Sequence, residues 1–150
     1  MHLAQLVGVW KLVFVNVSEG SVGYDYGPNP LGRIFFSPDG YMNAMITDPD
    51  QAKPLPNGTD WTTASDKQLA TIARPMVAYS GPYQVVQKGG ETYTHVDVEV
   101  SLNPNLIGTE QVRYSSFEEK NGKSLLSLIP VVNGTKSDNV LIWEKEAAPA

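Results

Sequence analysis

The chain is built from short apolar runs that are separated by glycine, proline, asparagine and aspartate. Within most runs apolar and polar residues alternate, which is the period of a strand with one buried face. The runs expected to form strands are residues 6–17, 31–37, 41–47, 76–87, 92–102, 109–118, 124–132 and 139–144. Most connections are short, so consecutive strands should pair antiparallel. The pattern predicts an all-β protein: an up-and-down antiparallel meander of eight to nine strands that closes into a barrel and so protects its edges.

One segment has the period of a helix instead. Ser65 and Gln68 form a capping-box pattern, and apolar residues then recur at helical spacing, at Leu69, Ile72, Ala73 and Met76. Pro75 disfavours the helical conformation of the residue before it, so the helix should end near Arg74. We therefore expect a single short helix in the otherwise all-β chain.

Composition limits the number of domains and the kinds of partner. The chain has 150 residues, of which 41% are hydrophobic, enough for one core, and we expect one domain over residues 1–150. The formal net charge is -5, which argues against nucleic acid as a partner. No apolar run approaches the length needed to cross a bilayer, so no membrane association is expected. The absence of cysteine fits a reducing cytoplasm, which is the expected location, but it would also be tolerated outside the cytoplasm.

The residue inventory also limits the chemistry. Without cysteine, and with His2 and His95 as the two histidines, the chain has little material for a transition-metal site, and no metal is expected. No nucleophile elbow, phosphate-binding loop or dinucleotide fingerprint occurs, so we expect no cofactor.

The run 92–101 separates apolar from ionisable residues. Valines at 96, 98 and 100 alternate with His95, Asp97 and Glu99. If the next hairpin centres on residues 104–106, Arg113 lies opposite Asp97, and His95 lies opposite Ser115. This register predicts that a histidine, two carboxylates and an arginine share one surface.

The side of the sheet to which this surface belongs decides its chemistry. Inside a barrel, Arg113 would keep Asp97 ionised and His95 could act as a general acid or base. Outside, the same residues would form a solvated face with weak ion pairs. Both arrangements are open from the residues alone. The catalytic hypothesis takes His95 and Arg113 as catalytic residues and Asp97 and Glu99 as ligand contacts.

A second candidate group is aromatic and amide in character. Residues 37–40 read Ser-Pro-Asp-Gly, a tight turn that should join the strands 31–37 and 41–47 into a hairpin. With Phe36 opposite Tyr41, one face of this hairpin carries Phe36, Tyr41, Asn43 and Met45, and a buried Asn43 would need a hydrogen-bond partner. These four residues and Tyr83 are the predicted ligand contacts, and Tyr79 is a predicted catalytic proton carrier. Taken singly, each aromatic residue could equally fill the core.

The three tryptophans suggest other roles. Trp10 and Trp143 lie near the two ends of the chain and are expected to close the barrel floor. Trp61 precedes the predicted helix, where it could seal the barrel mouth as part of a lid or simply anchor its loop. The sequence leaves both roles for Trp61 open.

Several stretches also resemble a known family. They are Gly8-Val9-Trp10, residues 26–33 with 38–42, Ala78-Tyr79-Ser80-Gly81-Pro82-Tyr83, residues 95–113, and the closing Leu141-Ile142-Trp143-Glu144-Lys145. Together they resemble the small lipocalin-like domain family of bacteria and fungi over nearly the whole chain. The resemblance implies an antiparallel barrel with a ligand-sized interior, and the positions of His95 and Arg113 match the family's pattern.

The resemblance implies a class of function as well. Some lipocalin-like barrels from natural-product pathways catalyse isomerisation or cyclisation without a cofactor. A cofactor-free isomerase or cyclase acting on a small, mostly apolar organic molecule is therefore the leading expectation. In it, His95 or a pocket tyrosine moves protons, and Arg113 stabilises developing negative charge. A non-catalytic carrier with the same cavity is the alternative, and a homodimer is compatible with both.

Overall fold

The structure, a computed structural model, describes residues 3–17 and 26–149, and His2 lies outside this part of the chain. The elements are α1 (Leu3–Leu6), β1 (Gly8–Asn16), β2 (Leu31–Phe36), β3 (Tyr41–Thr47), η1 (Pro56–Gly58), η2 (Trp61–Thr63), α2 (Asp66–Ala73), β4 (Val77–Lys88), β5 (Glu91–Asp97), β6 (Val100–Ser101), η3 (Pro104–Leu106), β7 (Glu110–Lys120), β8 (Lys123–Val132), β9 (Thr135–Lys136) and β10 (Val140–Lys145).

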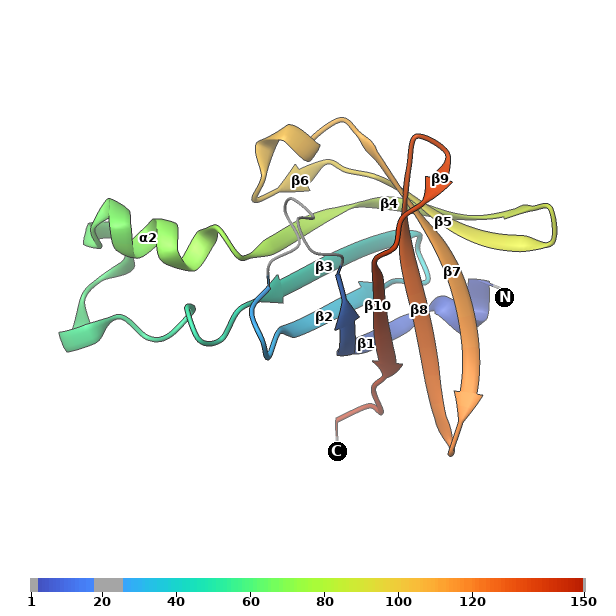
Figure 1. The fold of residues 1–150 in the computed structure, drawn as a ribbon, viewed down its shortest axis with the longest axis horizontal. Helices are drawn as coiled ribbons and strands as arrows, with labels where there is room; N and C mark the ends of the chain where they lie inside the picture. Colours follow the sequence, from blue (N-terminus) through green and yellow to red (C-terminus); the bar gives the residue numbers. More distant parts are fainter. Residues whose placement is uncertain (1–2, 18–25, 150) are drawn as a thin grey trace.

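Eight of the strands form a closed antiparallel barrel (Figure 1). Their order around the barrel is β1, β2, β3, β4, β5, β7, β8 and β10, so neighbours along the chain are also neighbours in the barrel. The last strand, β10, pairs with both β8 and β1 and closes the ring. The two-residue strands β6 and β9 attach to β4 and β8. The prediction of a closed up-and-down barrel is confirmed.

The floor of the barrel is built around a buried indole. Trp10 is fully buried, its Nε1 donates a hydrogen bond to the Leu6 carbonyl oxygen at 2.8 Å, and its ring meets Phe117 edge to face at 6.4 Å between centroids. Trp143, at 2% exposure, belongs to the same apolar core. Trp10 and Trp143, which were predicted to close the barrel floor, are both buried in the apolar core.

The first hairpin has a different register from the one predicted. Phe36 pairs with Met42, not with Tyr41. The Ser37 amide donates to the Tyr41 carbonyl oxygen, so Ser37 lies opposite Tyr41 and the turn consists of residues 38–40 instead of 37–40. The Gly40 amide donates to the Ser37 carbonyl oxygen, and Gly40 adopts a φ of 94°, which allows this tighter turn. A shift of one residue moves every side chain of the second strand to the opposite face. The predicted inward face of residues 41, 43 and 45 is therefore wrong, and Met42, Ala44 and Ile46 point inward.

The pairing of β5 with β7 also differs from the prediction. Arg113 lies opposite Thr94, and Asp97 lies opposite Glu110. The chain leaves β7 after Val98, which exchanges hydrogen bonds with residues 108 and 109, and the segment 99–107 crosses to β4 through β6. The connection between β5 and β7 is therefore longer than the tight hairpin predicted from the sequence. Because the resulting shift is an odd number of residues, Arg113 and His95 lie on opposite faces of the sheet, and the predicted shared surface is wrong.

The connection between β3 and β4, residues 48–76, extends away from the barrel (Figure 1, green). It contains α2, whose predicted capping box between Ser65 and Gln68 is confirmed, and the helix ends before Pro75 as expected. No residue of α2 is buried. Within the described residues, no helix is both long and apolar enough to span a membrane.

Candidate functional site

The barrel encloses a small cavity, here called the inner cavity. Side chains from six strands surround it, among them Ile34, Ala44, Tyr79, Arg113, Leu128 and Trp143. Its volume is about 50 Å³, whereas sites for organic ligands span roughly 300–1,000 Å³. The interior is therefore largely filled by side chains, and the expectation of a ligand-sized interior is wrong for this cavity.

A larger space, here called the groove, adjoins the inner cavity and measures about 660 Å³. Tyr26, Val77, Tyr79 and Arg113 line both spaces, so the groove and the inner cavity are adjacent. Its remaining walls come from the end of α2, the start of β4, the segment 101–106 and Gln111. The volume of the groove is in the range of sites for small organic ligands.

The side chain that connects the two spaces is Arg113. Its cross-strand neighbours, Thr94 and Pro130, are both buried, which places Arg113 on the inner face of β7. The guanidinium donates to the Val112 carbonyl oxygen at 3.0 Å and to Gln111 Oε1 at 3.4 Å. Arg113 forms no ion pair with the described residues, because no carboxylate among them lies within ion-pair distance of its guanidinium. A permanently charged group thus faces the site, and its partners within the described part of the chain are neutral.

Two further polar atoms at the site are buried and have no hydrogen-bond partner among residues 3–17 and 26–149. They are Ser101 Oγ, whose residue lines the groove, and Trp143 Nε1, whose residue lines the inner cavity. Buried polar groups are hydrogen-bonded in most proteins, and leaving one unpaired costs about 1–3 kcal/mol. These two atoms are therefore available to a ligand or water that enters from the groove.

Gly81 allows the groove wall to form. A Cβ at this position would lie 1.8 Å from the Asp97 carbonyl oxygen, so the chain between β5 and β6 crosses β4 where only glycine fits. Beyond the crossing, the Glu99 and Leu102 amides donate to the Ser80 and Ala78 carbonyl oxygens at 2.9 and 2.8 Å. These contacts hold Ser101 and Leu102 along the groove.

The predicted histidine and carboxylates lie on the outside of the barrel. His95 Nδ1 is 3.2 Å from Glu110 Oε1, and the His95 side chain is 28% exposed. Asp97 and Glu99 are exposed. The inner face of β5 carries Thr92, Thr94 and Val96 instead, because the strand directs the residues between its ionisable positions inward. The structure thus separates His95, Asp97 and Glu99 from Arg113.

The predicted ligand contacts of the first hairpin fall into two groups. Tyr41, Asn43 and Met45 are exposed on the outer face, a consequence of the register shift at Gly40. Phe36 and Tyr83 point inward but fill the core, where their rings meet edge to face at 5.1 Å. The Tyr83 hydroxyl donates to the Ser37 carbonyl oxygen at 2.8 Å, and burial raises the pKa of its phenol. Neither Phe36 nor Tyr83 lines the inner cavity or the groove.

Two of the predicted site residues, Arg113 and Tyr79, are brought together, since both line the inner cavity and the groove. The sequence reasoning missed Ser101, Gln111 and Arg74, which also line the groove. The polar residue Gln111 alternates with Arg113 along β7, and this spacing was a usable signal. No local sequence pattern identifies Ser101, because its position depends on the crossing at Gly81.

Trp61, expected as a lid or an anchor, is 54% exposed and lines neither the inner cavity nor the groove.

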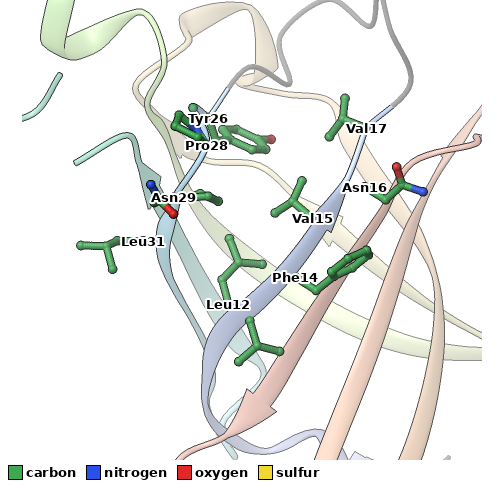
Figure 2. A pocket seen from close by; sticks show the side chains of 12 residues that line it. Leu12, Phe14, Val15, Asn16, Val17, Tyr26, Pro28, Asn29 and Leu31 are labelled. Carbon is green, nitrogen blue, oxygen red and sulfur yellow. The ribbon is translucent and has the colours of Figure 1, made fainter. Parts of the chain in front are cut away.

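A third recess of about 700 Å³ lies beside β1 (Figure 2). Residues 12–17 and 26–31 line it, and Figure 2 shows Phe14 and Val15 pointing to opposite sides of β1. Its described lining residues include no acidic or basic side chain. The recess therefore offers a ligand no charged contact from these residues, in contrast to the groove.

Comparison with known proteins identifies a family. A family model described as a lipocalin-like domain matches residues 7–146, a range that includes all the barrel strands. No curated protein and no solved structure matches the chain significantly.

Proposed function

The chain belongs to the lipocalin-like domain family, and from this premise we propose that it binds a small, mostly apolar organic molecule in the groove above Arg113. The observation that carries the proposal is the groove itself, whose volume of about 660 Å³ lies in the range of small-molecule sites. Apolar side chains of Val77, Leu102 and Leu106 supply its walls. Arg113 and Ser101 supply convergent polar groups, as such sites require.

Binding can be tested with the neutral fluorescent probe N-phenyl-1-naphthylamine. We expect the protein to bind it saturably with one-to-one stoichiometry. Val77→Phe should weaken this binding by roughly tenfold or more, because the added ring would enter the space that the probe occupies. Fluorescence titration measures both quantities.

Val131→Phe is the matched control for this experiment. Val131 lies opposite Val112 on the outer face of β8, so the same substitution there should leave probe affinity within about twofold. Circular dichroism should show β structure for both variants. Absence of saturable binding to the wild-type protein, or an equal loss in both variants, would contradict the proposed site.

A cofactor-free isomerase or cyclase is the second candidate function. The observation that favours it is that Tyr79 and Arg113 line the same cavity, where a phenol could move a proton and a guanidinium could stabilise an enolate. Because His95 lies on the outside of the barrel, Tyr79 is the predicted catalytic residue that could still carry a proton in the cavity. Catalysis therefore depends on fewer groups than the sequence suggested, and binding is the better supported function.

Catalysis predicts a specific effect of a single hydroxyl. With a ligand identified by displacement of the probe, Tyr79→Phe should lower product formation by roughly a hundredfold while leaving probe affinity nearly unchanged. Tyr114→Phe serves as the control, because Tyr114 lies opposite Tyr93 on the outer face of β7. Turnover is measured by chromatography of the ligand after incubation. Equal turnover in the wild type and Tyr79→Phe would exclude Tyr79 as the proton carrier.

A further inference from the structure

The groove has a charge opposite in sign to that of the whole chain. The protein has 16 acidic and 11 basic residues, yet the described residues that line the groove include Arg74 and Arg113 and no aspartate or glutamate. A local field of this sign in a protein of net charge -5 raises the local concentration of anions at the site. It equally disfavours cationic ligands.

Arg113 provides the stronger argument, since it is the charge in the deeper position. A partly buried guanidinium is costly without a counter-charge, and here its partners are the Val112 carbonyl and the Gln111 amide. Arginine presents a planar fork of donors that matches a carboxylate or a similar oxyanion. An anion entering from the groove would therefore supply a counter-charge that the described residues do not provide.

The surroundings define the rest of such a ligand. Ser101 Oγ, which is buried and has no partner among the described residues, can donate to an anionic oxygen, while Val77, Leu102 and Leu106 offer apolar contact. We propose that the groove selects an amphipathic organic acid in its ionised form, with the anionic group at Arg113 and the apolar body along the groove walls. This inference rests on the proposed function, because it assigns the ligand class of the same groove.

Two probes with one ring skeleton separate the charge from the apolar body. 8-Anilinonaphthalene-1-sulfonate carries an anionic group, and N-phenyl-1-naphthylamine is the same skeleton without it. We expect Arg113→Met to weaken binding of the sulfonate by about tenfold or more, the scale of a lost charge-assisted hydrogen bond, and to change binding of the neutral probe by less than about twofold. Arg113→Lys should lie between, since it keeps the charge but loses the fork.

Arg33→Gln is the matched control, because it removes the same charge from an arginine outside the groove. Arg33 Nε forms an ion pair with Glu146 Oε2 at 3.1 Å, and Arg33 does not line the groove. Its two probe affinities should match those of the wild type. Equal weakening of the sulfonate by Arg33→Gln and Arg113→Met would overturn the proposal, as would an equal loss of both probes in Arg113→Met.

A measurement on the unaltered protein keeps the inference testable if Arg113→Met does not fold. Displacement of the neutral probe by 2-naphthoate should require at least about tenfold less competitor than displacement by 2-naphthalenemethanol, which has the same rings and no charge. Equal displacement by the two competitors refutes selection of an acid but leaves the proposed binding function intact. Failure of the neutral probe itself to bind refutes the proposed function.

Discussion

Replacing Trp10 by alanine should destabilise the barrel by about 3–5 kcal/mol, the range for removing a fully buried large aromatic side chain. Trp10 is fully buried, packs edge to face on Phe117 and donates its indole hydrogen to the Leu6 carbonyl oxygen. The substitution would leave a cavity at the floor and an unpaired carbonyl. Urea denaturation followed by circular dichroism measures the free energy of unfolding.

Trp61 provides a control of the same residue type. It lies in η2, on the segment that extends from the barrel, and is 54% exposed. Trp61→Ala should change the free energy of unfolding by no more than about 0.5 kcal/mol, as expected for an exposed surface position. Similar losses in the two variants would show that the segment 48–76 contributes to stability as much as the floor does.

The second large effect is expected at Gly81. Alanine there would place a Cβ 1.8 Å from the Asp97 carbonyl oxygen, a backbone atom that cannot move without opening the crossing of β4. We expect a loss of about 3 kcal/mol in the free energy of unfolding, at the upper end of the range for overpacking. Because the crossing holds Ser101 and Leu102 in place, Gly81→Ala should also weaken binding of the neutral probe.

Gly58→Ala separates this steric clash from the general cost of replacing glycine. A Cβ at Gly58 would meet nothing within 4 Å, but its φ of 66° lies in the left-handed region. The expected cost is about 1 kcal/mol, from backbone strain alone. If urea denaturation gave Gly81→Ala the same small loss, the close crossing of β4 by the chain after Asp97 would be wrong.

Local patterns were sufficient to predict most of the secondary structure. Alternation identified all eight barrel strands to within a few residues, and the Ser65 capping box identified the start of α2. These signals depend on residues close together in the chain, which is why they can be read without the structure. The prediction of barrel closure followed from the same local connections.

The site was harder to predict because it depends on register. The tighter turn at residues 38–40 and the excursion after Val98 each shift strand pairing by an odd number of residues, and an odd shift exchanges the inner and outer faces. The prediction of a catalytic surface around His95 is wrong for this reason, whereas Arg113 and Tyr79 do line the inner cavity. No local sequence pattern indicates how many residues of either connection lie outside the paired strands.

The pairing of the first strand with the last has a consequence for synthesis of the protein. Since β10 alone joins β1 to β8 in the ring, a chain emerging from the ribosome holds seven barrel strands before the ring can close. Until Trp143 arrives, Trp10 and Leu12 lack the strand that covers them. Formation of the native core must therefore follow translation of residue 145, and contact between such distant segments makes slow folding the expectation. Chains released before that point would be substrates for chaperones and proteases.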